Sequence, residues 1–216
     1  MPGQRKEKYA LRLFAPGGSV RSMPRVVREY KAQARARIVD AAQAVFRRGG
    51  FRTATMEDVA KEIGVSKGAI YLYFRSKSAL LAAIQERMRE RVLAHWEPLL
   101  DGGDVAEGIA ESLDDVFTGD VDPGIWHELI ADAAQDPELR AALEDDVRED
   151  LRGMREFLKR LEARGRIPKL RDRDTVAEIV LVLLHGTVVE LMLHGRGAQA
   201  RRTLVASLRY LLETDR

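Results

Sequence analysis

The sequence predicts an all-α protein in which an N-terminal three-helix helix-turn-helix domain precedes a larger C-terminal helical domain. Apolar residues recur at helical spacing through most of the 216 residues, without strand-like alternation of useful length. Breakers containing glycine or proline separate these segments. Charge is uneven: residues 1–80 hold 17 Lys and Arg against 6 Asp and Glu (net +11), whereas residues 81–216 carry a net charge of −9. This asymmetry indicates that the first third meets a polyanion and the rest does not.

Composition narrows the class of protein further. The chain contains no cysteine, which excludes disulfides, thiolate zinc sites and cysteine nucleophiles and fits a reducing cytoplasm. The most apolar segment, residues 175–195, includes Glu178, His185 and Glu190, and its longest uninterrupted apolar run is Ile179–Leu184. A membrane span needs about 18 apolar residues. We therefore expect a buried helix, no membrane partner and a cytoplasmic protein.

Residues 1–31 are expected to form a flexible basic arm. The first 22 residues show no sustained period and contain the turn-forming stretch PGGS. Met23 begins a segment that looks like a natural start in its own right. Residues 1–22 are therefore either an optional arm or a mis-assigned start, and the sequence does not decide between them.

Residues 32–78 are expected to form the helix-turn-helix domain, beginning with a helix over 32–48. This helix has one apolar stripe and ends at Gly49-Gly50. The stripe comprises Ile38, Ala42, Val45 and Phe46.

Two short helices should follow. Thr55 is a suitable N-cap, with Asp58 placed for a capping box, and begins a helix over Met56–Ile63. Gly64 supplies a turn, and Ser66 caps the next helix. We expect their small core to contain Ala60, Ile63, Val65, Ile70 and Phe74.

Residues 79–216 are expected to form the second domain. A helix over 77–96 leads into it, with an apolar stripe of Leu80, Leu81, Ile84, Met88 and Val92. Further helices are predicted over 104–118, 124–134, 137–164, 173–194 and 197–213.

The segment ARARIVDAAQAVFRRGGFRTATMEDVAKEIGVSKGAIYLYFRSKSALL, residues 34–81, resembles the DNA-binding domain of the TetR family of bacterial one-component transcriptional regulators. Its core, IGVSKGAIYLYFRSK, is a specific signal. Residues 125–167 and the stretch LHGTVVELMLHG loosely resemble the regulatory domain of BetI-like members of that family. This second likeness does not define a ligand.

The resemblance implies a set of DNA-contacting residues, which the chemistry of these side chains supports. Positions matching Ile70 and Phe74 pack inside in the family. The family positions that touch DNA match Thr55, Ser66, Lys67, Gly68, Tyr71, Tyr73 and Lys77. We add Thr53 because it stands at the N-terminal end of the preceding helix, and we expect Lys67, Ala69 and Tyr71 to read bases. The alternative is that the lysines are solvated and Tyr71 is a packing aromatic.

The C-terminal half is expected to sense a ligand and to pair two chains. Helix 173–194 is apolar over most of its surface, and helix 197–213 repeats the pattern with Leu204, Leu208, Leu211 and Leu212. We predict that both helices form a homodimer interface. The residues expected to line a ligand cavity are Trp96, Phe117, Trp126, Leu129, Phe157, Leu161, His185 and Val188. The alternative for each of these is an ordinary core position.

Neither catalysis nor a cofactor is indicated. The stretch HELIA, residues 127–131, begins like a zinc-protease motif but lacks the second histidine. No nucleophile elbow or phosphate-binding glycine loop is present. We expect no metal and no enzyme.

The sequence thus predicts a ligand-responsive transcriptional regulator. We expect a repressor that binds a near-palindromic DNA operator and is released by a small, mostly apolar effector. The first alternative is a DNA-binding activator or architectural protein without an effector. A helical enzyme or lipid carrier with an anion-binding segment is a second, and membrane-surface binding by residues 1–31 is a third.

Overall fold

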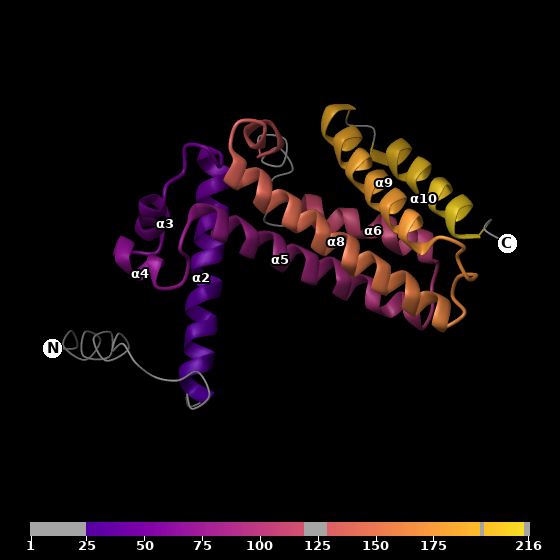
Figure 1. Ribbon diagram of the computed structural model, residues 1–216, viewed down its shortest axis with the longest axis horizontal. Helices are drawn as coiled ribbons and strands as arrows, with labels where there is room; N and C mark the ends of the chain where they lie inside the picture. The colour runs from indigo at the N-terminus through magenta and orange to yellow at the C-terminus, as the bar shows by residue number, and fades with distance from the viewer. Residues whose placement is uncertain (1–24, 119–128, 195–196, 214–216) are drawn as a thin grey trace. The chain divides into compact units, whose positions relative to one another are not determined.

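The computed structural model describes residues 25–118, 129–194 and 197–213, with side chains for 29–113, 129–193 and 197–213. Every regular element in these ranges is helical, as predicted (Figure 1). The helices are α2 (Arg25–Gly49), α3 (Met56–Glu62), α4 (Lys67–Tyr71), α5 (Lys77–Trp96), the 3-10 turn η3 (Glu97–Leu100), α6 (Val105–Thr118), α8 (Pro137–Ala163), α9 (Arg173–His194) and α10 (Gly197–Glu213). Residues 129–133 are also helical, whereas the start of the predicted helix 124–134 lies outside the described residues.

The first helix begins earlier than the sequence pattern indicated. Residues 25–31, which we assigned to a flexible arm, are the first turns of α2. This stretch contains no glycine or proline, has several good helix formers, and places Val26, Val27 and Tyr30 at helical spacing over about one turn, a signal too short to have been recognised as a helix. Residues 1–24 of the predicted arm lie outside the described residues.

Internal contacts divide the chain into two units, Met1–Arg37 and Ile38–Arg216. In the first unit, the described side chains of residues 29–37 are exposed except for the half-buried Ala34. The second unit contains the remaining helices and both hydrophobic cores.

The first core holds the helix-turn-helix together. The predicted stripe of α2 is buried in it, as are Ala60, Ile70 and Phe74. Ile63 is only half-buried, and Val65 is 41% exposed, so its assignment to the core was wrong. The cause is the turn, because Gly64 has a φ of 69° and the amide of Val65 donates to the carbonyl of Ala60 at 3.0 Å. This Schellman-type ending places Val65 beyond the helix.

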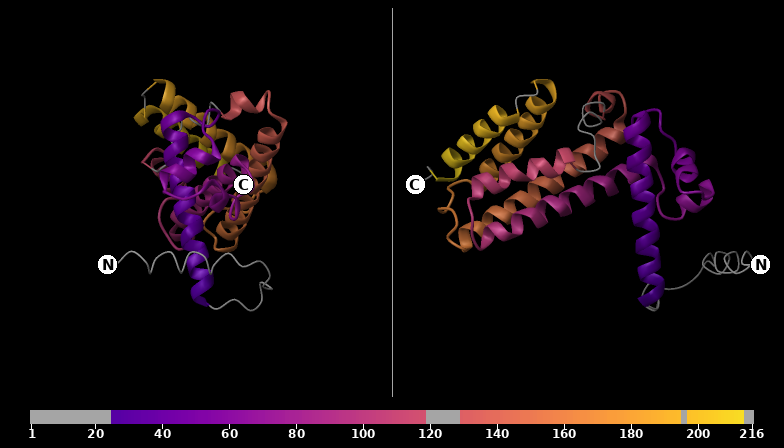
Figure 2. Two further views of the ribbon diagram at one scale, coloured as in Figure 1. Left: turned by 90° about the vertical axis from the view of Figure 1, so that its left-hand side faces the viewer. Right: turned by 180° about the vertical axis from the view of Figure 1, so that it is seen from behind.

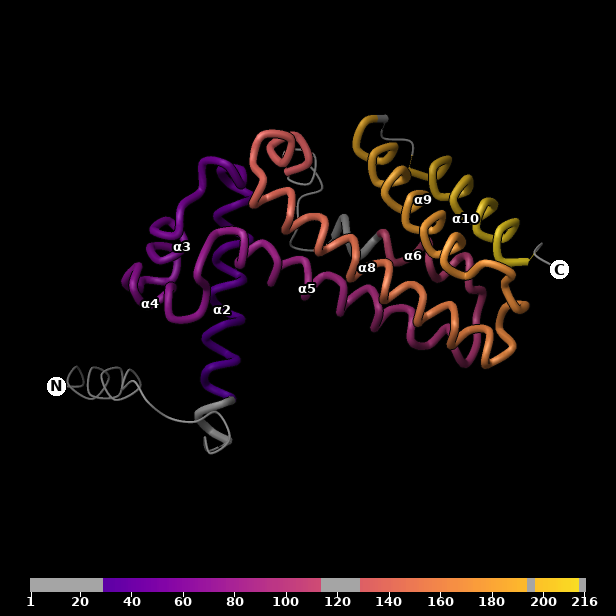
Figure 3. The backbone as a smooth tube through the Cα atoms, in the orientation of Figure 1, coloured from indigo at the N-terminus to yellow at the C-terminus, as the bar shows by residue number. Residues whose placement is uncertain are grey.

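Helix α5 belongs to both cores of the second unit. Leu80, Leu81 and Ile84 pack in the first core, and Trp96 packs in the second. The first core also contains Leu129, Ala133, Leu139 and Leu143, from the helical segment 129–133 and the start of α8. The helix-turn-helix core therefore draws on residues far beyond position 78. Figure 3 shows α5 as one continuous helix through this region.

The second core lies among α5, α6, α8, α9 and α10. Helices α5 and α8 run parallel, since Arg89 contacts Asp150 at the middle of α8 and Glu97, directly after α5, contacts Arg160 near the end of α8 (2.8 Å). Helices α9 and α10 lie side by side, as the views in Figures 1 and 2 agree.

Helix α9 is partly buried and partly apolar on its open side. Among the described residues, Arg173–Leu193 is the one helical stretch long and apolar enough to cross a membrane by length and composition alone. Its buried face packs in the second core through residues that include Val180 and Leu184. On its other side, Val182 is 69% exposed.

Candidate functional site

The helix-turn-helix is closed by interactions within the chain. Thr55 caps α3: its hydroxyl accepts from the amide of Asp58 at 3.2 Å, and its own amide donates to the Asp58 carboxylate at 3.0 Å. The predicted capping box is therefore present. The hydrogen bonds from the hydroxyl and amide of Thr55 lower the pKa of Asp58. The Ser66 hydroxyl accepts from the amide of Ala69 at 3.3 Å and caps α4 as predicted.

Helix α4 has an exposed face. Lys67 is exposed and Tyr71 is 45% exposed, with the Lys67 ammonium 6.0 Å from the centre of the Tyr71 ring. Leu72, directly after the helix, is 62% exposed, which the sequence analysis did not single out. The signal was present, since Leu72 falls between the inward-facing Ile70 and Phe74.

Gly68 lies on the same helix, and a side chain there would meet almost nothing. A Cβ built at Gly68 has only the Ser66 hydroxyl within 4 Å, at 3.9 Å. A glycine within a helix costs about 1 kcal/mol relative to alanine. Packing within the described chain therefore does not explain this glycine.

Lys77 has a structural role that its position in the sequence did not reveal. Its ammonium donates to the carbonyls of Phe51 (2.7 Å), Arg52 (3.1 Å) and Ala54 (3.1 Å). It also lies 4.4 Å from the centre of the Phe51 ring. The three protons of the ammonium are directed at the loop before α3, so a phosphate contact through this group does not fit the conformation observed. Lys77 holds that loop in place.

The remaining predicted DNA-contacting residues lie on or near this surface. The hydroxyl of Thr53, an exposed residue, donates to the carbonyl of Gly49. Tyr73 is half-buried and packs against the first core, and Ala69 is half-buried in α4.

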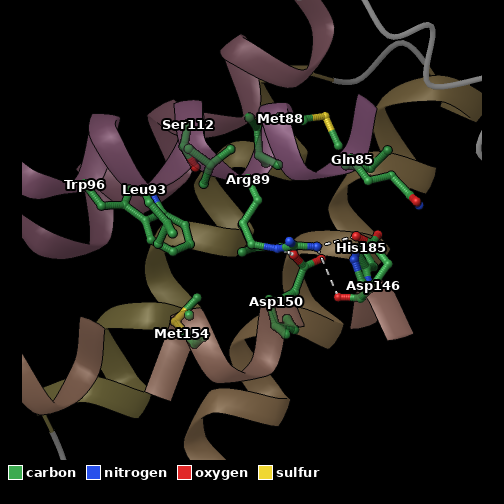
Figure 4. A pocket seen from close by; sticks show the side chains of 16 residues that line it. Gln85, Met88, Arg89, Leu93, Trp96, Ser112, Asp146, Asp150, Met154 and His185 are labelled. Carbon is green, nitrogen blue, oxygen red and sulfur yellow. Dashed lines mark hydrogen bonds and ion pairs between the residues drawn. The ribbon is translucent and has the colours of Figure 1, made fainter. Parts of the chain in front are cut away.

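A cavity of about 150 Å³ lies among α5, α6, α8 and α9 (Figure 4). Most of its wall is apolar, including Trp96, Leu113 and Met154. Of the residues expected to line a cavity, Trp96, His185 and Val188 do so. The side chains of Phe117 and Trp126 lie outside the described part of the structure.

Three expected lining residues do not reach this cavity. Leu129 is buried in the first core. Phe157 packs behind the wall against Trp96, with ring centres 5.1 Å apart, and Leu161 is buried in the second core. Apolar character in the sequence did not distinguish the cavity wall from the packing behind it.

One end of the cavity is charged, which the sequence analysis missed. Arg89 of α5 donates to Asp150 of α8 at 2.5 Å and to Asp146 one turn earlier (Figure 4). We call Arg89, Asp146 and Asp150 the carboxylate end. The stretch EDDVRED around the aspartates resembles a solvated helix face, and only its meeting with α5 makes it part of a cavity.

Burial shifts the ionisation of these groups. Burial, followed by the charge of Asp150, raises the pKa of Asp146 to about 7, against the opposing effect of Arg89. Burial lowers the pKa of Arg89, but the hydrogen bond and charge of Asp150, with a smaller effect of Asp146, more than offset this, and the net pKa is raised. The guanidinium bonds to both aspartates, so one positive charge is shared between two carboxylates.

His185 stands beside the carboxylate end (Figure 4). Burial lowers its pKa, and the charge of Asp150 opposes this shift. Because part of the His185 side chain is exposed to water, we expect burial to lower its pKa only slightly.

Two buried polar groups on the cavity wall have no hydrogen-bond partner among the described residues. They are the side-chain amide of Gln85, which is 4% exposed, and the indole N–H of Trp96. Buried polar groups of folded proteins are nearly always hydrogen-bonded to protein or water. These two groups are therefore left to bond to a water molecule or a ligand that reaches them.

Known proteins resemble this chain in sequence and in fold. Residues 38–84 match the model of the bacterial regulatory proteins of the tetR family. The HTH-type regulator YfiR of Bacillus subtilis is 28% identical over 170 residues, covering 76% of this chain and 83% of YfiR. The HTH-type regulator UidR of Escherichia coli K12 is 24% identical over 158 residues, covering 73% of this chain and 81% of UidR.

Solved structures agree in fold. GusR of Salmonella enterica superposes with a TM-score of 0.66 at 25% identity, over 83% of this chain and 95% of GusR. A TetR-family regulator of a Rhodococcus species superposes with a TM-score of 0.68 at 23% identity, over 84% of this chain and 100% of that protein. The helix-turn-helix, its matched motif and the helical second half together lead to one conclusion: residues 38–84 carry the DNA-binding helix-turn-helix of the tetR family of bacterial regulatory proteins, and most of the chain resembles regulators of that kind.

Proposed function

We propose that this regulator is a homodimeric repressor that binds a near-palindromic operator and leaves it when a small, mostly apolar effector enters the cavity. One observation carries the proposal. Helix α5 contributes Leu80 and Ile84 to the core of the helix-turn-helix and Arg89 and Trp96 to the cavity wall. A ligand that moves this helix therefore changes the position of the helix-turn-helix as well as that of the cavity wall. The match to the tetR family also supports the expectation that the chain is a regulator and not an enzyme.

The exposed face of α4 is proposed to enter the major groove. Gly68 supports this. Nothing in the described chain requires a glycine at this position, and the lack of a side chain allows DNA to approach closely. Lys67, Ala69 and Tyr71 are proposed to read bases, since their positions face outward or border that face. The proposed backbone contacts are Thr53, Thr55, Ser66, Tyr73 and the main chain at Lys77.

A second copy of the chain is proposed to cover the open sides of α9 and α10. Val182 on α9 and Tyr210 on α10, 75% exposed, are apolar surface on these adjacent helices. The leucines that first suggested this interface behave differently, because Leu204, Leu208 and Leu212 are buried within one chain. Two chains would present two α4 helices to half-sites about one helical turn apart.

The effector must bind the DNA-incompetent state more tightly than the DNA-bound state, or it shifts nothing. Solved structures of the same fold support a small-molecule effector: one is a complex of SmeT with triclosan (TM-score 0.61, 23% identity), and another is a regulator from Saccharomonospora viridis with choline (TM-score 0.58, 18% identity). We propose that residues 32–78 carry the DNA reader, that residues 79–216 carry sensing and dimerisation, and that the protein acts in the cytoplasm. The narrower likeness to BetI-like regulators stays a prediction.

The test is binding of the purified full chain to DNA flanking its own gene, with a randomised duplex as competitor. We expect tight binding to one near-palindromic site, at a stoichiometry of two chains per site. Equal, salt-sensitive binding to both duplexes would favour an architectural protein that grips phosphates only. Operator binding that no ligand of the cavity relieves would favour the effector-independent alternative.

A further inference from the structure

We infer that the cavity selects an organic cation, with an ammonium group at the carboxylate end and an apolar body lying along α5 toward Trp96. The inference rests on the proposed effector-responsive function and specifies its ligand. It is drawn from the charge, the hydrogen bonding and the length of the cavity.

The charge of the cavity wall is unbalanced. Its charged side chains are Arg89, Asp146 and Asp150, so one guanidinium faces two carboxylates. Arg89 bonds to both carboxylates, so its single positive charge is shared between two negative charges. The side chain of Asp146 is only 10% exposed, so water screens this charge poorly. A second cation beside Asp146 would balance the end of the cavity.

The hydrogen-bonding groups at this end suit an ammonium. The two carboxylates have acceptor positions beyond those that Arg89 occupies. The Gln85 amide lies one turn of α5 before Arg89, is buried in the wall and lacks a partner among the described residues. A head group that reaches this amide would satisfy it, and its unsatisfied state is independent of the charge count. An anionic head group would instead face two carboxylates, with Arg89 already engaged.

The rest of the cavity suits an apolar body. Trp96 lies seven residues after Arg89 on α5, or about 10 Å along the helix. Between them the wall is formed by Val92, Leu93 and, from α8, Gly153 and Met154. A cavity of about 150 Å³ accommodates a body of roughly the size of benzene. The ligand is therefore short, with one charged and one apolar end.

Three probes with one aromatic body test the head group: 2-phenylethylammonium, 2-phenylethanol and 3-phenylpropanoate. Calorimetric titration of the full chain at pH 8 should give at least about tenfold tighter binding of the ammonium than of the other two. The alcohol or the carboxylate binding as tightly as the ammonium, or no binding of any probe at millimolar concentration, would overturn the inference.

Asp146→Asn should remove the preference for the ammonium while leaving the affinity for the alcohol within about twofold. Asp145→Asn is the matched control, because the adjacent Asp145 is exposed, pairs with Arg148 on the surface and makes the same charge change. The control should retain the preference. Equal loss in both variants would assign the effect to net charge and contradict the inference.

If Asp146→Asn does not fold, the pH dependence of ligand binding by the wild-type chain tests the inference independently. The charged neighbours of Asp146 are Arg89 on α5, Asp150 and Glu149 on α8, and His185 on α9 beside it. Below pH 7 Asp146 gains a proton, and at still lower pH His185 gains one, so both changes disfavour a cation. The preference for the ammonium should therefore shrink from pH 8 to pH 5.5, and a preference independent of pH would count against the site.

Operator release separates this inference from the proposed function. If the alcohol or the carboxylate releases the operator and the ammonium does not, the regulator is effector-responsive but the cation assignment is wrong. If the chain binds no operator, the proposed function fails, while the titrations still report the head group that the cavity prefers.

Discussion

The turn region of the helix-turn-helix and the cavity differ in how their polar groups are satisfied. Around α3 and α4, Thr55, Ser66 and Lys77 each bond to the chain itself. In the cavity, Gln85 lacks a partner among the described residues, and Asp146 shares the one charge of Arg89 with Asp150. Satisfied groups fix a single geometry, which suits a surface that reads DNA. Unsatisfied groups stabilise the empty cavity poorly and leave interactions for a ligand to make.

The largest expected effect is the destabilisation of the folded chain by the buried charge of Asp146. Its pKa is raised to about 7 in the folded chain, from an ordinary value near 3.9 when unfolded. Between pH 4 and pH 7 the unfolded chain releases this proton first, so rising pH favours unfolding, and above pH 7 the penalty is complete. Asp146→Asn should therefore be more stable than wild type at pH 8, by up to about 4 kcal/mol, with little difference at pH 4. Thermal unfolding at both pH values measures this; a gap independent of pH would mean that Asp146 is well compensated.

Lys67→Ala tests the reading surface directly. We expect the free energy of operator binding to weaken by about 1–3 kcal/mol, or roughly five- to 150-fold in affinity, if Lys67 reads a base. Stability should be unchanged, because the side chain is exposed. Fluorescence anisotropy with labelled operator measures the loss. Lys159→Ala, which removes an exposed lysine of α8, should leave operator affinity unaltered.

Lys77→Met tests whether the lysine holds the loop. Loss of its bonds to three carbonyls should cost roughly 1–3 kcal/mol in the free energy of unfolding. Lys61→Met is the control, since Lys61 makes an exposed pair with Glu57 worth no more than about 0.5 kcal/mol. Denaturant unfolding compares the two. If Lys77→Met lowers operator affinity without lowering stability, its ammonium contacts DNA after all.

Gly68→Ala should separate stability from function with the smallest change. An added methyl group has room in the free protein and should stabilise α4 by about 0.5–1 kcal/mol. The same methyl group should weaken operator binding, because it stands where DNA is proposed to approach. Denaturant unfolding and fluorescence anisotropy with labelled operator, measured on one preparation, test the expected gain in stability and the expected loss of operator affinity. Improved stability with unchanged operator affinity would move the DNA contact away from Gly68.

Local signals made most of the fold predictable. The helix over 77–96 was predicted with the bounds of α5, and the caps at Thr55 and Ser66 were confirmed, because capping depends on a few neighbouring residues. Residues 25–31 were missed because the apolar spacing of Val26, Val27 and Tyr30 extends over only about one turn, and the described side chains there, residues 29–31, are exposed. Val65 was misassigned because its place follows from the left-handed turn at Gly64 rather than from spacing.

The cavity was less predictable, because its polar groups come together only in three dimensions. Arg89 and Asp146 are distant in sequence, and each looks like a residue of a solvated helix face. Phe157 and Trp96 are both large aromatics, yet only Trp96 borders the cavity, since Phe157 packs behind it. Hydrophobic character identifies the core but does not reveal where the core is hollow.

The packing of α8 into the first core limits how this protein can be rebuilt. Leu139 and Leu143 complete the apolar interior around α2 and α5, so a DNA-reading fragment cut at residue 84 would expose that interior to water. Hybrid sensors that join this reader to a foreign sensing half would lack the same contacts. A chimera should therefore graft residues 129–143 together with the reader, and its solubility would depend on that junction more than on the linker.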